Sequence, residues 1–276
     1  MSLSKAQERA AIIMLSAGAG RLILAGGGAQ IAHGLVERTT MDLDAFMRPE
    51  ENFTEVTERV RAALEAANYE VAEDQDAMST NEIASWLVQE KSVSKGGRPR
   101  AIVKIQMCRD TIALDAVSTR YGPTMDPLEL GANKILAIYD RYRHRDYDDL
   151  ARISRVVPMD QMLDVADLKQ VTQLGRSELA ESFRNIRRLK DEDFPVPEQV
   201  PGLRRWFLDL ADRVDIGGDL DIPSPYDATW RTVQPASTPR LDGQDKVLMD
   251  RLRDRLNRTT GSGSTTPPSA NHNRSL

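Results

Sequence analysis

Hydrophobic and polar positions along the first 125 residues fall into short runs that predict strands and longer stretches that predict helices. The apolar run at residues 22–25 is short and stops at glycine, which predicts a buried strand. Residues 41–46 alternate, so Asp42 and Asp44 are expected on one face of a second strand and the apolar side chains on the other. Further strands are expected in the second half of the ambiguous segment 79–90 and at residues 68–71, 101–107 and 111–117, the last two as an antiparallel pair.

Apolar residues spaced three and four positions apart predict helices around these strands. One helix opens the chain, and another covers residues 50–67. After residue 126 only helices are expected, at residues 126–139, from residue 147, and at 160–174, 177–189, 200–214 and 245–256. The chain is therefore expected to be α+β, with a sheet-containing core at residues 1–125, a helical region at 126–258, and a disordered tail at 259–276 that is rich in Ser, Thr, Gly, Asn and Pro.

The composition is that of a globular chain, with 276 residues of which 40% are hydrophobic and 29% charged. This length suits one large domain or two modest ones. The net charge of -5 gives no general affinity for nucleic acid, so any such contact has to come from a local basic patch. Two candidate patches are the turn at residues 91–100 and a helical face formed by Arg184, Arg187, Arg188 and Lys190. Each patch by itself is typical of a solvated surface.

Cysteine usage and the N-terminal pattern favour a cytoplasmic protein. The single cysteine, Cys108, excludes an intramolecular disulfide and a multi-cysteine zinc site. Residues 5–20 bear a faint likeness to a secretory signal, but Glu8 lies where positive charge is needed and the apolar spacing is helical. No apolar run is long enough to span a bilayer, so no membrane is expected.

A glycine turn follows the first predicted strand. Gly26 and Gly27 permit a tight turn, and the amides that open the next helix have no partner within it, so they suit an anion. No Gly-Lys-Ser or Gly-Lys-Thr follows, so the turn is not a P-loop. By itself, a glycine run after a strand is more often only a turn.

Carboxylates on the predicted strands suggest a metal site. Asp42 and Asp44 repel each other, and Mg2+ relieves such repulsion while taking its other ligands from water and substrate phosphates. Asp115 lies on the predicted strand at 111–117, where an unpaired buried carboxylate is costly, so it is expected to share that cation. Asp110 is its rival as the third carboxylate. An aspartate pair on a strand is by itself more often polar surface.

The order of these features resembles that of polymerase-beta-like nucleotidyltransferases, and more closely that of the AbiEii/AbiGii toxin family, over roughly residues 22–150. The matching positions form a glycine turn, an Arg followed by Thr-x-Asp-x-Asp, a Lys-x-x-Ala helix and an Arg-Asp-x-x-Asp-Leu element: Gly26, Gly27, Ala29, Arg38, Thr40, Asp42, Asp44, Lys134, Ala137, Arg145, Asp146, Asp149 and Leu150. Two departures, a third glycine at Gly28 and threonine in place of the commoner serine at Thr40, leave the chemistry intact.

The resemblance implies a polymerase-beta-like mixed sheet with flanking helices, and Mg2+-dependent transfer of a nucleotide from a nucleoside triphosphate (NTP). It gives catalytic positions to Asp42, Asp44, Asp115, Lys134 and Asp146, metal binding to the three first-named of these, and nucleotide binding to Gly26, Gly27, Arg38, Thr40 and Lys134. It also implies a separately encoded antitoxin and an RNA acceptor, which is tRNA for some members. A protein acceptor, a small-molecule acceptor as in antibiotic nucleotidyltransferases, and a non-catalytic binding module remain alternatives.

Overall fold

The computed structural model describes residues 3–36, 38–77, 79–91 and 101–227. All of the described residues belong to one compact unit. The expected helix at 245–256, the tail at 259–276 and nearly all of the basic turn at 91–100 lie outside the described residues. The division of the chain at residue 125 stays a prediction.

A seven-stranded mixed sheet forms the centre of the described chain, in the order β3-β4-β5-β2-β1-β7-β6. Two neighbouring pairs are parallel, β2 with β5 and β1 with β7, and the other pairs are antiparallel. The strands are β1 (Ile23–Ala25), β2 (Asp42–Met47), β3 (Tyr69–Glu73), β4 (Ile83–Glu90), β5 (Val103–Arg109), β6 (Val117–Thr119) and β7 (Gly122–Thr124). The expected α+β class with a mixed sheet is confirmed.

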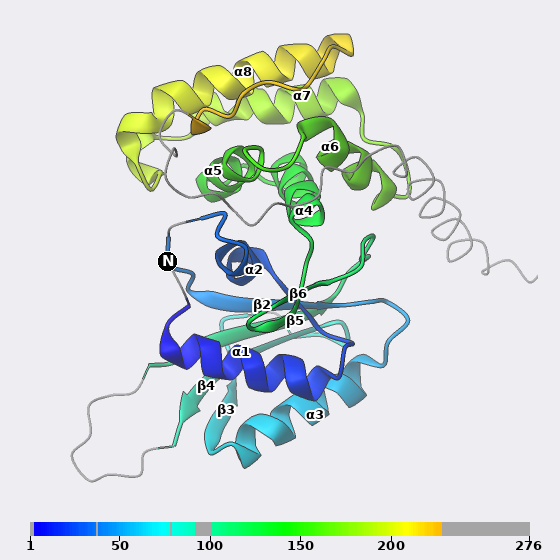
Figure 1. Ribbon diagram of the computed structural model, residues 1–276, viewed down its shortest axis with the longest axis vertical. Coiled ribbons are helices and arrows are strands. Elements are labelled where there is room, and N and C mark those ends of the chain that lie inside the picture. The colour runs from blue at the N-terminus through cyan, green and yellow to red at the C-terminus, as the bar shows by residue number, and fades with distance from the viewer. Residues whose placement is uncertain (1–2, 37, 78, 92–100, 228–276) are drawn as a thin grey trace, which may run out of the picture. The chain divides into compact units, whose positions relative to one another are not determined.

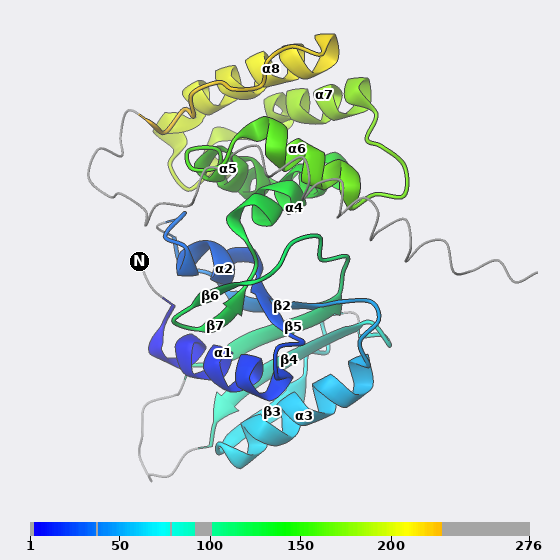
Figure 2. The same cartoon turned by 45° about the vertical axis from the view of Figure 1, so that its right-hand side comes forward.

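Helices cover both sides of this sheet. Those of the N-terminal half are α1 (Lys5–Gly18), α2 (Gly26–Ala32) and α3 (Phe53–Ala66). Those that follow the sheet are α4 (Pro127–Asp140), α5 (His144–Ile153), α6 (Met159–Leu168), α7 (Arg176–Arg184) and α8 (Val200–Ile216), with short 3-10 turns η1 (Asn185–Arg188), η2 (Asp191–Asp193) and η3 (Pro197–Gln199). Figures 1 and 2 show α1 and α3 on one side of the sheet, and α2 with α4 to α8 on the other. Side chains of β2 that point toward α2 therefore also point toward the later helices.

The alternating pattern of β2 gives the two faces that the sequence predicts. Leu43, Ala45 and Met47 are fully buried, whereas Asp42 and Asp44 on the other face are only partly buried. In the parallel pairing with β5, Asp42 lies opposite Lys104 and Asp44 lies opposite Gln106. The strand directly beside the aspartate pair thus presents a cation and an amide at these positions, and no carboxylate.

The strand predicted at 111–117 is wrong, because residues 110–116 leave the sheet as a loop and only Val117 enters a strand. The backbone amides of Ala113 and Leu114 donate to the buried Glu129 carboxylate on α4, at 2.9 and 3.0 Å. Lys169 Nζ lies 2.8 Å from the same carboxylate. A side chain from a distant helix thus takes the hydrogen bonds that a neighbouring strand would have taken.

The last described segment, residues 217–227, packs against α5. Ser224 donates from Oγ to the Ala151 carbonyl at 2.5 Å. The Tyr226 hydroxyl donates to Asp148 Oδ1 at 2.6 Å, and Asp148 also accepts from Arg152 Nε at 2.9 Å. The helix that follows the Arg-Asp motif is therefore enclosed on this side by the chain's own later residues.

Within the described ranges, no helix has both the length and the apolar character needed to cross a membrane.

Candidate functional site

The glycine turn lies directly against the aspartate strand. Gly26 has φ of +54°, and a Cβ built there would lie 1.9 Å from Asp44 Oδ2. A Cβ on Gly27 would lie 2.6 Å from Thr40 Oγ1. Because neither residue carries a side chain, the backbone at the start of α2 closes onto the face of β2 that bears the carboxylates.

This close approach predicts a difference between two glycines that both have positive φ. Gly34, with φ of +70°, has nothing within 4 Å of a built Cβ. Gly34→Ala is expected to cost only the left-handed backbone penalty of about 1–2 kcal/mol. Gly26→Ala is expected to cost about 1–3 kcal/mol more, because Asp44 has to move away. Urea unfolding of both variants measures the difference, and equal losses would show that Asp44 is not held against the turn.

Thr40 fixes the first aspartate of the pair. Its hydroxyl donates to the Asp42 carbonyl at 3.1 Å and lies 3.2 Å from Asp42 Oδ1. Lys104, opposite Asp42 on β5, lies 2.7 Å from Asp74, so its charge is already shared with another carboxylate. The negative charge of Asp42 and Asp44 is therefore not balanced by a direct ion pair within the described residues.

The pKa of Asp44 reflects this imbalance. Burial and then the neighbouring Asp42 raise the pKa of Asp44 from its ordinary value of 3.8 to about 6, although Lys134, Arg141 and Lys104 pull it down. The folded protein thus makes the ionised form of Asp44 unfavourable, and a cation bound beside it would reverse that effect.

Asp44→Asn is consequently expected to raise the melting temperature in the absence of divalent cations. Since each pKa unit is worth about 1.4 kcal/mol, the ionised Asp44 carboxylate destabilises the fold by about 3 kcal/mol or less. The folded-state pKa lies above the ordinary value, so this penalty is complete above about pH 6 and disappears as the pH falls toward about 4.

Thermal unfolding between about pH 5 and pH 8 measures this effect. Glu58→Gln, which removes an exposed carboxylate on α3, serves as the matched control. If Asp44→Asn raises the melting temperature at about pH 7.5 by no more than Glu58→Gln does, the prediction is contradicted.

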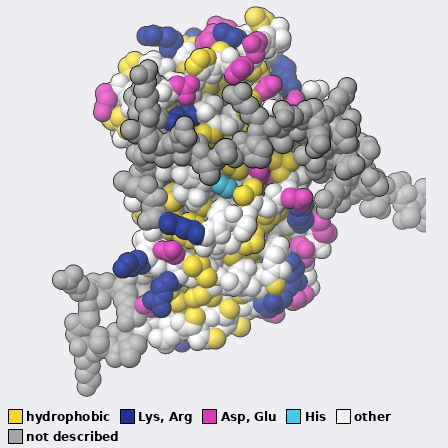
Figure 3. Space-filling model, in the orientation of Figure 1, with side chains coloured by type: hydrophobic (Ala, Val, Ile, Leu, Met, Phe, Trp, Pro, Cys, Tyr) yellow, Lys and Arg dark blue, Asp and Glu magenta, His cyan; other side chains and the backbone are white. Residues whose placement is uncertain are grey.

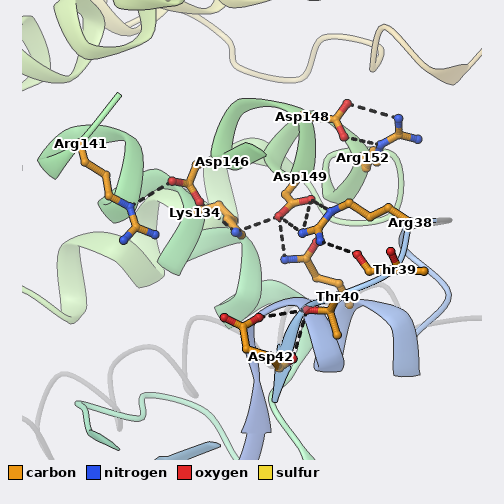
Figure 4. Close-up of polar contacts among 11 residues, drawn as sticks. Arg38, Thr39, Thr40, Asp42, Lys134, Arg141, Asp146, Asp148, Asp149 and Arg152 are labelled. Carbon is orange, nitrogen blue, oxygen red and sulfur yellow. Dashed lines mark hydrogen bonds and ion pairs between the residues drawn. The ribbon is translucent and has the colours of Figure 1, made fainter. Parts of the chain in front are cut away.

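Lys134 on α4 is held between two carboxylates of α5 (Figure 4). Its Nζ lies 2.9 Å from Asp146 Oδ1 and 2.9 Å from Asp149 Oδ2. Burial alone would lower the pKa of Lys134, but Asp149 and Asp146 outweigh burial and raise it. Lys134 therefore stays protonated, with 15% of its side chain exposed.

Asp149 is the centre of this network, although the sequence analysis assigned it only a motif position. Its fully buried carboxylate accepts three hydrogen bonds from Arg38, at 2.8 to 3.1 Å, and one from Gln30 Nε2 at 3.3 Å, besides the contact with Lys134. Burial opposes its charge, yet Lys134 and Arg38 together lower the pKa of Asp149. Asp149 is thus a permanent anion that joins α2, the segment before β2, and α4.

Two further residues complete the cluster. Arg141, half exposed just after α4, donates from Nε to Asp146 Oδ2 at 3.2 Å. Gln30 is fully buried, and its Oε1 has no hydrogen-bond partner among the described residues. The signal for Gln30 in the sequence was only a polar residue in an otherwise apolar short helix.

The structure does not bring the third predicted carboxylate to the site. The Asp115 side chain is 99% exposed in the loop after β5, where it lies 3.8 Å from Arg48. Its rival Asp110 lies 3.4 Å from Lys169. Within the described residues, no group of three His, Cys, Asp or Glu side chains is placed to hold a metal ion. The expectation that Asp115 joins the aspartate pair is therefore corrected, because the loop carries it to solvent.

The remaining pair still fits a magnesium ion. Mg2+ is usually bound by one or two carboxylates together with waters and substrate phosphates, and does not need a cage made only of protein. Asp42 and Asp44 share one face of β2, and the raised pKa of Asp44 shows uncompensated negative charge there. Two carboxylates beside a glycine turn thus match the ligand set for a metal that arrives with a triphosphate.

Comparison with solved structures defines the class to which this fold belongs. MenT4, a nucleotidyltransferase toxin from Mycobacterium tuberculosis, is 16% identical and covers 93% of this chain and 90% of its own, with a TM-score of 0.55. JHP933 from Helicobacter pylori is 15% identical and covers 95% of this chain and 97% of its own, with a TM-score of 0.47. No curated protein matches the chain. The MenT4 likeness shows that the fold is that of a nucleotidyltransferase.

The family follows from the sequence match. Residues 10–228 match the family described as nucleotidyl transferase AbiEii toxin of type IV toxin-antitoxin systems, and the chain belongs to this family. It is therefore a nucleotidyltransferase, and the family implies an NTP as substrate and an antitoxin as partner.

Proposed function

We propose that this toxin-family nucleotidyltransferase transfers a nucleotide from an NTP to an RNA acceptor in a Mg2+-dependent reaction, with tRNA as the first acceptor to test. The observation that carries the proposal is the common location of two sets of residues. Asp44 lies against the glycine turn, and Asp42 shares its face of β2, on the side of the sheet that also carries the Lys134, Asp146 and Asp149 cluster (Figures 1 and 2). Acidic metal ligands and a fixed cation are the groups that phosphoryl transfer needs.

The transfer step forms one bond and breaks one. A hydroxyl oxygen of the acceptor attacks the α-phosphorus of the NTP, and the bond from that phosphorus to the oxygen that bridges it to the β-phosphate breaks. Pyrophosphate leaves, and the hydroxyl proton passes to water. Asp42 and Asp44 would hold Mg2+, which when bound neutralises charge on the triphosphate. The raised pKa of Asp44 supports this role, because a cation is what its ionised form lacks.

Lys134 would face the negative charge of the triphosphate. It is a buried, protonated ammonium fixed by two carboxylates, so little reorganisation is needed when the charge of the reacting phosphate changes. The amides of Gly26 and Gly27 would contact phosphate oxygens. Thr40 supports Asp42 through its hydroxyl.

Asp146 is better suited to orient cations than to accept the proton. Its two oxygens are taken by Lys134 at 2.9 Å and by Arg141 at 3.2 Å. Arg38 likewise gives its Nε and Nη2 to Asp149, while Nη1 lies beside Gly27. We assign Asp146 the positioning of Lys134, and Arg38 the support of the glycine turn.

The test uses labelled NTPs with total RNA, with and without Mg2+. Wild type is expected to label RNA only when the metal is present, and Asp44→Asn is expected to lose labelling by at least about 100-fold. Asp115→Asn is the matched control, because the exposed Asp115 lies in the loop away from the pair and should retain full transfer. Labelling that persists in Asp44→Asn would overturn the proposed site, and label that enters only small molecules would overturn the RNA acceptor.

A further inference from the structure

The basic side chains that the sequence predicts on one helical face differ in whether they already have a carboxylate partner. Arg184 lies 2.9 Å from Asp212 and 3.2 Å from Asp215, and Lys190 lies 3.4 Å from Glu192. Arg187 and Arg188 on η1 are exposed and have no carboxylate partner in the part of the chain that the structure describes. The predicted basic face therefore shrinks to these two arginines.

A second exposed basic segment lies between α4 and the first turn of α5. Arg143 and Arg145 are exposed, and neither has a carboxylate partner within the described ranges. Tyr142 stands between Arg141 and Arg143 with 47% of its surface exposed. An exposed tyrosine flanked by arginines is what stacking on a base and contact with phosphates require.

Packing brings these two segments together beside the site. The His144 ring packs edge-on against Phe194 at 5.8 Å, which joins the start of α5 to the chain after η2. The Tyr147 hydroxyl donates to the Ser182 carbonyl on α7 at 2.6 Å. In keeping with this packing, the pKa of Tyr147 is raised by burial and then by Tyr142, and is lowered by Arg188.

The same surface is continuous with the Lys134 cluster. Arg141, which directly precedes Tyr142, is bound through its Nε to Asp146, whose other oxygen holds Lys134. On the face drawn in Figure 3, basic and acidic side chains are interspersed, in keeping with the net charge of -5. A polyanion would thus need a local cluster of unpaired cations, and this one lies next to the proposed transfer site.

We infer that Tyr142, Arg143, Arg145 and Arg188 form a docking surface for the single-stranded end of a polynucleotide acceptor. This inference rests on the proposed function and adds to it the place where the acceptor enters. Tyr142 stacks on a base, the arginines contact phosphates on either side, and the acceptor hydroxyl is delivered toward the Lys134 cluster. A protein acceptor would not require an exposed aromatic ring beside the unpaired Arg143 and Arg145.

The experiment measures binding separately from transfer. A fluorescent single-stranded RNA oligonucleotide is titrated, without NTP, with the full chain carrying Asp44→Asn, so that no transfer occurs. Adding Tyr142→Ala is expected to weaken binding about 10-fold, and Tyr142→Phe, which keeps the ring, should stay within about twofold. If Tyr142→Phe loses RNA binding as Tyr142→Ala does, a stacking role for the ring is overturned.

The arginines are tested through the salt dependence. Arg143→Ala with Arg188→Ala should make the slope of log affinity against log salt shallower by about 1.4, since two phosphate contacts on a single strand are lost. Lys5→Ala with Arg59→Ala removes two exposed charges on the opposite side of the sheet and is the matched control. If Arg143→Ala with Arg188→Ala has the same RNA affinity and the same salt slope as the control double variant, the proposal is overturned.

A failure of the proposed docking surface can be told apart from a failure of the proposed catalytic site. If Asp44→Asn still labels RNA, the proposed catalytic site fails, while the binding result for Tyr142 stands on its own. If wild type labels a protein and not RNA, and Arg143→Ala with Arg188→Ala reduces that labelling, the polynucleotide docking surface is overturned in favour of a protein-binding one.

Discussion

Lys134→Met is expected to reduce nucleotide transfer by about 1,000-fold or more, because Lys134 is a buried cation fixed by two carboxylates at 2.9 Å and would face the triphosphate. Methionine has a similar shape but no charge. The change also leaves Asp146 and Asp149 without their shared partner. Removing one partner of a buried pair costs about 3–5 kcal/mol, and the lower end applies here because Arg141 and Arg38 remain.

The measurement is kcat/KM for transfer at a temperature at which circular dichroism shows the variant folded. Lys169→Met is the matched control, because Lys169 is another buried lysine, 2.8 Å from Glu129. The control is expected to lose stability by a similar amount and to retain transfer per folded molecule. Transfer by Lys134→Met above about a tenth of the wild-type rate would show that its charge is not needed.

Asp149→Asn is expected to reduce transfer by about 100-fold and to lower the free energy of unfolding by about 3 kcal/mol. An amide offers one accepting oxygen and puts an NH2 donor in place of the other, so it cannot accept the full set of bonds from Arg38, Lys134 and Gln30, and it carries no charge to hold the two cations. The preceding residue supplies a control on the same helix. Asp148 is equally buried but pairs with Arg152 and Tyr226, away from the glycine turn.

Asp148→Asn should therefore destabilise the protein by a comparable amount while leaving transfer per folded molecule within about threefold of wild type. Urea unfolding and steady-state kinetics on the same samples separate the two effects. Equal kinetic losses in both variants would mean that α5 acts only as a scaffold, and that Asp149 has no specific part in holding Lys134.

The local features of the site could be predicted because they depend on short-range periodicity. Alternation in β2 fixes which face carries Asp42 and Asp44, and this pattern survives in the observed strand. Gly26 marks a close approach of backbone to side chain, which is why glycine is needed there. Helical spacing after residue 126 likewise places Lys134 on a helix that buries its other face.

The features that could not be predicted depend on partners far apart in the sequence. Asp115 alternates with apolar residues as a strand residue would, but Glu129 on α4 binds the amides of that segment and draws it out of the sheet. Asp149 looked like a motif position because its partners Gln30, Arg38 and Lys134 come from three separate parts of the chain. Local patterns in the sequence do not show which distant segments come together around one side chain.

The segment after α8 has a practical consequence for shortening this protein. A fragment that stops at Ile216 would keep all helices of the described residues but would lose Tyr226. The Tyr226 hydroxyl binds Asp148, and its ring centre lies 4.4 Å from the Arg152 guanidinium. The smallest autonomously folding piece should therefore extend through Tyr226, and proteolytic trimming upstream of that residue should loosen the helix that carries Asp149.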